Sequence, residues 1–174
     1  ASTPVEAVFS FHAINFLAAG EDAPGAEVRR DPDGFLLWQP PTPEKPWLQG
    51  ACSICSDVEG LAVDAAWFRG GWFDHATRLW QTIARADCLD RAQPCSGDPS
   101  PGGSLYAPLR LGPGAEQTVR LRLAWHVPAS NLKVRSDPPP PGGECCPGGS
   151  CGPQTPAAPG THVPWYATRF EDIQ

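Results

Sequence analysis

Hydrophobic and polar residues alternate along several short stretches of the chain, which is the pattern of β-strands. The stretch 5–16 places five apolar residues on one face: Val5, Ala7, Phe9, Phe11 and Ala13. Its other face is mixed: Glu6, Ser10 and His12 with Val8 and Ile14. We therefore predict a strand here that is half to fully buried.

A tight turn with a strand on either side is predicted between Val28 and Trp38. The turn sequence is Asp-Pro-Asp-Gly at 31–34. Proline fixes one backbone dihedral of such a turn, and we expect Gly34 to supply a positive φ. The two aspartates are therefore interpreted as turn residues and not as an acid–base pair.

Two further short strands are predicted at 50–55 and 61–66, after which the period changes from two to that of a helix. Asp74 is a favourable N-cap, and apolar residues recur at helical spacing up to Ala86. These apolar residues are Ala76, Leu79, Trp80 and Ile83. We predict one substantial helix, with Trp80 in the core.

The clearest alternation comes late in the chain, after a Leu-Gly-Pro-Gly turn at 111–114. Four apolar residues share one face: Val119, Leu121, Leu123 and Trp125. Arginines occupy two positions of the other face, so a shift of one residue would bury them and the register is strongly fixed. Pro128 ends this strand because it cannot donate to a sheet.

The segment 137–160 contains eight prolines and six glycines. Such a sequence buries too little apolar surface to offset its ordering entropy. We therefore predict three parts: a β-sandwich portion at 1–128, a flexible Pro/Gly/Cys-rich insertion at 129–161, and a return segment at 162–174. The predicted fold is mainly β, an antiparallel sandwich with one short helix and a long irregular loop.

Charge and hydropathy argue against two classes of partner, nucleic acids and the membrane interior. The net charge is −6 and the 13 basic residues are scattered, which argues against nucleic-acid binding because phosphates are bound by clustered Lys and Arg. The sequence contains no apolar run of about 20 residues, so no transmembrane helix is predicted.

The seven cysteines leave three alternatives open. Cys52 and Cys55 have the spacing of a zinc knuckle, but they lie in a strand, where the period of two points them to opposite faces. Cys88 and Cys95 could close a short disulfide loop. The remaining three lie in the insertion, where they could fold round a zinc ion or pair with one another or with Cys88 and Cys95: Cys145, Cys146 and Cys151. Buried, unreactive thiols are favoured for the first pair, and no metal or cofactor is predicted.

No catalytic site is predicted from the residues. The four histidines, His12, His75, His126 and His162, accompany no nucleophile motif. A glycosidase needs two carboxylates about 5 to 9.5 Å apart, and the spacing of the acidic residues marks no such pair. The candidates considered were Asp57, Glu59, Asp64, Asp74, Asp87 and Asp90.

The densest aromatic cluster is the segment 67–74. Trp67 and Trp72 could stack on sugar rings, and Arg69 and Asp74 could bond sugar hydroxyls. We take these four residues as candidates for substrate binding. A loop packed over the end of the sandwich, or against another domain, explains the same pattern and is the favoured interpretation.

Five segments in this order resemble the N-terminal domain of the non-lysosomal glucosylceramidase and bile-acid β-glucosidase family. They are 4–11 (PVEAVFSF), 68–74 (FRGGWFD), 111–114 (LGPG), 123–128 (LAWHVP) and 165–170 (WYATRF). The resemblance implies a β-sandwich packed against a large helical (α/α)6 barrel. It also implies a retaining β-glycosidase as the parent enzyme, acting on a glycoside or glycolipid, with both catalytic carboxylates in the barrel.

The sequence departs from that family in two ways. The family has a further β-rich stretch before the part matching Pro4, so we expect this chain to be an internal fragment. A sandwich lacking those strands is expected to expose the apolar faces of Phe9, Phe11 and Trp125. The cysteine-bearing insertion is not associated with the family.

The leading hypothesis is therefore a non-catalytic domain that supports the barrel, with a contribution to the wall of its cleft as a further expectation. The alternative is a stand-alone carbohydrate-binding or adhesion module that uses exposed tryptophans. A small metal-binding protein is a third alternative and depends on the cysteines alone.

Overall fold

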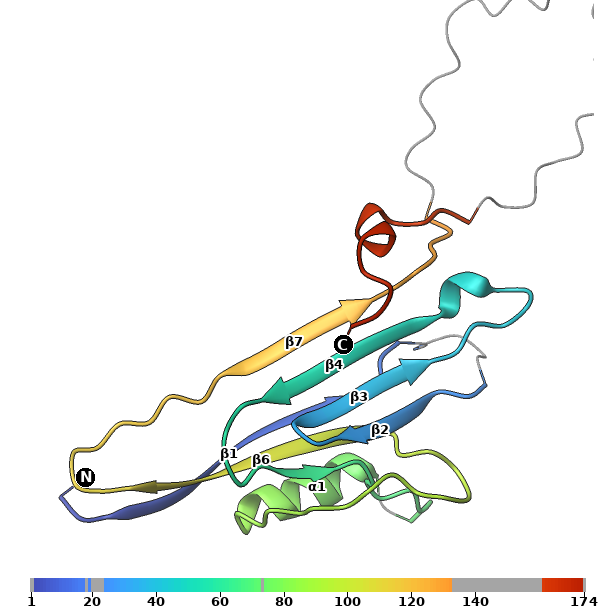
Figure 1. Cartoon of the computed structure of the whole chain (residues 1–174). Helices are drawn as coiled ribbons and strands as arrows, with labels where there is room; N and C mark the ends of the chain where they lie inside the picture. Colours follow the sequence, from blue (N-terminus) through green and yellow to red (C-terminus); the bar gives the residue numbers. More distant parts are fainter. Residues whose placement is uncertain (1, 18, 20–23, 73, 133–160, 174) are drawn as a thin grey trace, which may run out of the picture.

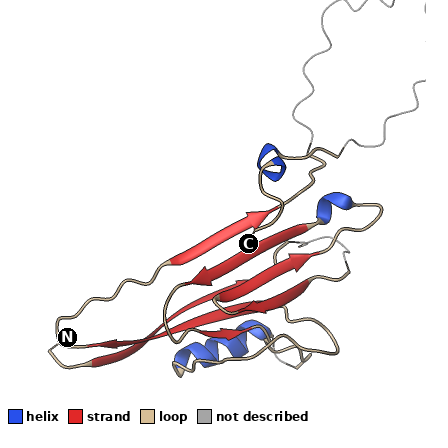
Figure 2. Ribbon diagram, in the orientation of Figure 1, coloured by secondary structure: helices blue, strands red, loops and turns tan. Residues whose placement is uncertain are grey.

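The computed structural model describes residues 2–17, 19, 24–72, 74–132 and 161–173. Two antiparallel sheets pack against each other, and one short α-helix covers the three-stranded sheet (Figures 1 and 2). The predicted fold class, a mainly β antiparallel sandwich with one short helix, is confirmed. The predicted irregular loop at 137–160 lies outside the described residues.

The smaller sheet has three strands in the order β1-β6-β5. They are β1 (Val5–Ile14), β6 (Gly102–Leu111) and β5 (Ala62–Asp64). The strand predicted at 5–16 is confirmed as β1, which pairs with β6 along its whole length. Phe9, Phe11 and Ala13 pack against the core, as the alternation predicts.

The central strand of this sheet, β6, is not evident from the sequence because Gly102, Gly103 and Pro108 interrupt its pattern. A Cβ on Gly103 would lie 2.5 Å from the Phe35 ring, so the glycine allows the two sheets to approach closely. Pro108 lies beyond the residues of β6 that pair with β5. At this position, β1 is the one strand paired with β6 in the described part of the chain. Proline is tolerated there because fewer ladder bonds are needed.

The larger sheet has four strands in the order β2-β3-β4-β7. They are β2 (Glu27–Asp31), β3 (Gly34–Gln39), β4 (Gly50–Ser56) and β7 (Leu121–His126). All four were predicted within a few residues of these bounds. A 3-10 turn, η1 (Pro46–Leu48), lies between β3 and β4.

The β2–β3 hairpin confirms the turn but corrects the role of Gly34. Asp31 pairs with Gly34 across the turn. Among the described glycines, positive φ is found at Gly25, Gly60, Gly97 and Gly114, so Gly34 is not needed for its φ. A Cβ on Gly34 would lie 1.9 Å from the Ile54 carbonyl oxygen, so the contact between β3 and β4 requires the glycine.

The core lies between the two sheets, where β3 faces β6 and β5 and where β2 faces β5. Its buried residues come from five strands and the segment after β5: Val28, Phe35, Leu37, Cys52, Ile54, Val63, Ala65 and Leu105. Phe35, Leu37 and Leu105 are 0% exposed. Side chains that alternate with these, such as Asp64 and Tyr106, point to the outer face of the small sheet.

The helix α1 (His75–Ala84) begins where predicted, and the Asp74 side chain accepts a hydrogen bond from the Thr77 N–H. The prediction that Trp80 is a core residue is wrong, because its side chain is 69% exposed. Leu79 and Thr82 instead face the small sheet. Neighbouring residues on a helix point about 100° apart, so only one of Leu79 and Trp80 can face the sheet.

The segment after the insertion returns to β7. Ser130 and His162 form an antiparallel bridge, and the 3-10 turn η2 (Trp165–Thr168) follows. The Tyr166 hydroxyl donates to the Val127 carbonyl oxygen at 3.1 Å. In the part of the chain that the structure describes, no helix is long and apolar enough to cross a membrane.

Candidate functional site

Trp67 comes directly after the buried segment that follows β5, and it is 5% exposed. Its indole N–H donates to the Ser104 hydroxyl at 2.7 Å, and its backbone N–H donates to the Ser100 hydroxyl at 2.9 Å. The ring also stacks on His75, with centroids 5.9 Å apart. Trp67 therefore connects the small sheet to α1, and its ring is not presented to solvent.

The other three residues predicted to bind sugar have different surroundings. Trp72 is 94% exposed. The Arg69 guanidinium donates to the backbone carbonyls of Ser96 and Asp98 and so fastens the loop that precedes β6. Asp74 caps α1, and its hydrogen bonds with Thr77 hold the pKa of its carboxyl below the usual range.

A shallow hollow brings part of this set together: it is lined by Arg69 and Asp74 with Phe68, His75 and Asp98. Trp67 and Trp72 are not among the residues that line it. The structure thus gives Trp72 the exposure that stacking requires, while Arg69 and Asp74 already have protein partners. Sugar binding by these four residues stays a prediction.

The inward face of β7 carries two exposed apolar side chains, Leu123 and Trp125, while Leu121 on the same face is partly buried against the core. Leu123 pairs with Ile54 and Trp125 pairs with Cys52. Directly opposite residues project from the same face of a sheet, and Ile54 and Cys52 point into the core. Leu123 and Trp125 therefore point toward the small sheet, yet they are 55% and 69% exposed.

This exposure follows from the strand orders. The large sheet continues from β3 through β4 to β7, whereas the small sheet continues from β6 only to β1. Consequently β7 extends one strand beyond the small sheet, and Figure 1 shows it as the outermost strand, far from α1. The expected exposure of Trp125 is confirmed. The expectation for Phe9 and Phe11 is wrong, because both are partly buried against the core.

Further exposed aromatics lie beyond the end of β7. The His126 ring approaches the Phe170 carbonyl oxygen at 3.1 Å and meets the Tyr166 ring edge-on. Trp165 and Phe170 nevertheless keep their side chains 68% and 61% exposed. Exposed apolar groups therefore lie both on β7 and on the segment that contacts its end.

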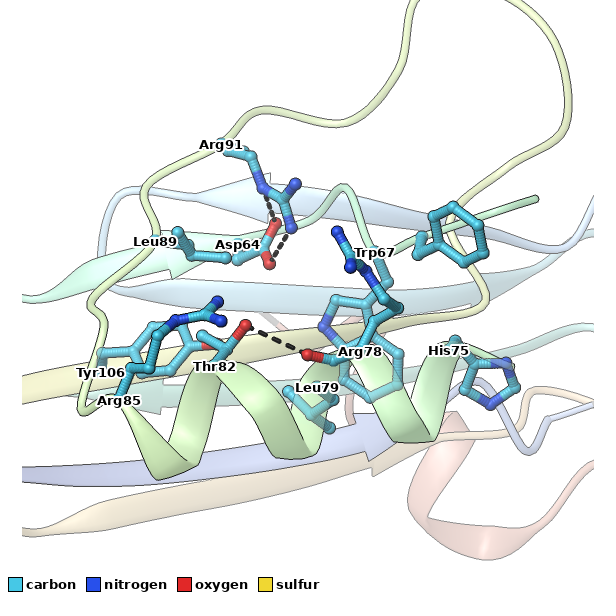
Figure 3. A pocket seen from close by; sticks show the side chains of 11 residues that line it. Asp64, Trp67, His75, Arg78, Leu79, Thr82, Arg85, Leu89, Arg91 and Tyr106 are labelled. Carbon is cyan, nitrogen blue, oxygen red and sulfur yellow. Dashed lines mark hydrogen bonds and ion pairs between the residues drawn. The ribbon is translucent and has the colours of Figure 1, made fainter. Parts of the chain in front are cut away.

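A cavity of about 180 Å³ lies between α1 and the outer face of the small sheet (Figure 3). Asp64 lies at its edge, 1% exposed, and receives two hydrogen bonds from Arg91: Nε to Oδ1 at 2.9 Å and Nη2 to Oδ2 at 2.6 Å. Arg78 and Arg85 extend toward this pair from one side of α1 (Figure 3). The cavity therefore combines three guanidiniums with one carboxylate among its described lining residues.

A buried hydrogen-bonded cluster surrounds the hydroxyl of Ser104 on the same face of the small sheet. His12 Nδ1 lies 2.8 Å from Ser104 Oγ, and His12 Nε2 lies 2.9 Å from Ser10 Oγ. Burial lowers the pKa of His12, with a smaller opposing effect from the charge of Asp64. Because Ser104 is 0% exposed and also accepts from Trp67, it cannot reach a substrate as a nucleophile.

A second groove, of about 290 Å³, lies on the outer face of the large sheet. It is lined by Trp38 and by carboxylates from two distant parts of the chain: Asp31, Glu171 and Asp172. Arg29 lies over the Trp38 ring, 4.9 Å from its centroid, and is also ion-paired with Glu27. This groove is acidic, but the guanidinium occupies one face of its aromatic ring.

The described cysteines are all free thiols. Cys52 is buried and Cys55 is half-buried on the opposite face of β4, as the strand pattern predicts. Cys88 and Cys95 are exposed and unpaired, so the disulfide alternative is wrong for this pair. Within the described ranges, no group of three or more His, Cys, Asp or Glu side chains could hold a metal ion. The cysteines of the insertion lie outside those ranges.

Two features of the site could not be read from the sequence. The cavity beneath α1 joins Asp64, Arg78, Arg91 and Tyr106, which are scattered along the chain with no shared spacing. The uncovered face of β7 has the same apolar alternation as a buried strand. Both depend on which element lies opposite, and local patterns do not contain that information.

No family model matches the chain. No curated protein matches it either.

Proposed function

We propose that this chain is a non-catalytic β-sandwich domain that docks onto a second protein body through the uncovered inward face of β7. The body is a helical catalytic barrel of the same polypeptide, and the parent protein is a retaining β-glycosidase similar to glucosylceramidases. The docking role is supported by the structure, whereas the parent enzyme is supported only by the ordered resemblance of five sequence segments.

The observation that carries the proposal is the exposure of Leu123 and Trp125, 55% and 69%, on the face that points into the sandwich. Exposed apolar patches of this kind mark protein contacts. Burying a large apolar side chain is worth about 1.5–3 kcal/mol, so covering these two residues would be a strong driving force for docking.

Trp125 and Trp80 form a matched pair for testing the docking surface, since both are 69% exposed. Trp125 belongs to the open face of β7 and Trp80 to the far side of α1. In the full-length gene product, Trp125→Ser should lower the yield of folded protein and its aryl β-glucoside hydrolysis, while Trp80→Ser should have little effect. Equal effects of the two substitutions would contradict docking through β7.

The catalytic part of the proposal has a separate test. The isolated chain should not hydrolyse an aryl β-glucoside, and the full-length gene product should. Turnover by the isolated chain that is abolished by a single Asp or Glu substitution would place catalysis in this domain. A full-length product with no β-glycosidase activity would refute the parent enzyme and leave the docking test standing.

One observation favours the carbohydrate-binding alternative: the side chain of Trp72 is 94% exposed. An indole ring that contacts so little protein is available to stack on a sugar. Titration with oligosaccharides should then change tryptophan fluorescence in a saturable way that is lost in Trp72→Ala and kept in Trp80→Ala. No saturable change, or a change that survives Trp72→Ala, would refute this alternative.

A further inference from the structure

We propose that the cavity between α1 and the small sheet binds a small organic carboxylate with an apolar body. The cavity measures about 180 Å³. It is distinct from the docking face of β7, because it lies on the outer side of the other sheet. The proposal therefore does not depend on the function proposed above.

The first argument is the balance of charge around the cavity. Asp64 is occupied by Arg91 and also accepts from the Ala66 N–H at 2.9 Å. Arg85 is ion-paired with Asp87, Nε to Oδ2 at 2.7 Å. Arg78, the third guanidinium, contacts neutral groups: the Gln81 side-chain oxygen and the Phe68 ring. The cavity thus keeps a net positive charge inside a chain whose total charge is −6.

The second argument is the buried hydroxyl of Tyr106. Tyr106 lines the cavity and is 1% exposed, and its hydroxyl makes no hydrogen bond of good geometry with a described residue. The neighbouring Ser104 hydroxyl, which lowers the pKa of Tyr106 slightly, is already bonded to Trp67 and His12. Leaving such a group unsatisfied is costly. Burial raises the pKa of Tyr106, so the hydroxyl stays protonated at neutral pH and is available as a donor. The oxygen of a bound anion would supply the missing acceptor.

The third argument is the geometry of the guanidiniums. Arg78 lies in α1 and Arg85 is its C-cap residue. They are seven residues apart, or about two helical turns, so both project from the same side of the helix. Figure 3 shows both side chains directed toward the strand that carries Asp64. Guanidinium groups bind planar carboxylates through two parallel hydrogen bonds. Arg78, which has no carboxylate partner in the described part of the chain, is assigned this contact.

The remaining residues that line the cavity favour an apolar group in the ligand. Trp67, Phe68, Leu79 and Leu89 provide aromatic and aliphatic walls. Small-molecule sites commonly combine such walls with a few polar groups that fix the orientation. A carboxylate on a compact ring would place its charge near Arg78 and Tyr106 and its ring against these walls.

Benzoate is the probe, titrated into the complete chain at constant ionic strength. The Trp67 indole N–H signal in two-dimensional NMR spectra reports on the site, since that group lies beside Ser104 and the cavity. We expect a saturable shift of this signal. Arg78→Gln and Tyr106→Phe should each weaken binding by at least about tenfold, because each removes a hydrogen bond to the charged group. Arg110→Gln, at an arginine 89% exposed on β6, should leave it unchanged.

Several results would overturn the proposal. These are no saturable shift, equal binding by all three variants, or equal binding of benzyl alcohol, which has the ring without the charge. Inorganic phosphate that competes as strongly as benzoate would show that the apolar walls contribute nothing. Folding of the variants is checked by their unperturbed amide spectra, and two separate substitutions keep the test informative if one variant fails to fold.

Discussion

The two halves of the sandwich have similar strand patterns but opposite packing. In the closed half, β2 and β3 cover β5 and β6, and Phe35, Leu37 and Leu105 are 0% exposed. In the open half, β7 extends beyond the small sheet, and Leu123 and Trp125 are more than half exposed. Apolar alternation therefore fixes the direction in which a side chain points, while burial depends on whether a second layer lies opposite.

The sharpest test of this comparison is one aromatic substitution in each half. Phe35→Ala should cost about 3–5 kcal/mol of unfolding free energy, because it leaves a cavity in a closed core. Trp125→Ala should cost less than about 1 kcal/mol, because the side chain is mainly in water. Urea unfolding followed by circular dichroism measures both. Similar costs would show that the open half is closed in solution.

Ion pairs provide a second contrast. Asp64→Asn in the layer beneath α1 removes the charge-assisted bonds to Arg91 and should cost about 2–3 kcal/mol. Asp57→Asn removes the 3.3 Å contact to Arg122 of β7. This substitution should cost less than about 0.5 kcal/mol, because both side chains are largely exposed. Chemical denaturation at low and at high salt compares the two. A larger loss for Asp57→Asn would reverse the comparison.

Glycines test the backbone packing of the same two regions. Gly34→Ala should destabilise the chain by about 1–3 kcal/mol, because the added methyl group meets the Ile54 carbonyl. Gly112→Ala, in the loop that leads toward β7, meets nothing within 4 Å and should be close to neutral. The measurement is the shift in melting temperature. A neutral Gly34→Ala would mean that β3 and β4 separate easily.

The smallest expected effect is a dependence of stability on pH, which comes from His12 on the outer face of the small sheet. Burial lowers the pKa of His12 below its ordinary value, so the unfolded chain binds this proton more readily. The stabilisation that neutral His12 contributes to the free energy of unfolding is fully present above a pH of about 6.5. It is lost as the pH falls toward the folded-state pKa. The urea midpoint of unfolding should therefore decrease as the pH is lowered from neutral to mildly acidic.

His12→Gln should flatten that dependence, while substitution of the exposed His162 by Gln should leave it intact. A slope that is unchanged in His12→Gln would assign the effect to another group.

Much of the fold could be predicted because local patterns encode it. The alternation of β1, the turn between β2 and β3, and the Asp74 cap are each set by neighbouring residues. The strand β6 was missed because its glycines and Pro108 weaken the local pattern, although contacts with Phe35 and the pairing with β1 stabilise it. Trp80 was placed in the core because helical spacing alone does not show which side of a helix meets the sheet.

The candidate sites depended still more on tertiary structure. The class of fold and the direction of the strand faces could be predicted from the sequence, because they follow from residue spacing and turn chemistry. The folded chain is needed to show that Trp67 is buried, that Leu123 and Trp125 are uncovered, and that Arg78 and Tyr106 line one cavity. Exposure and electrostatic environment are set by residues distant in sequence, through the order of strands and the side on which α1 packs.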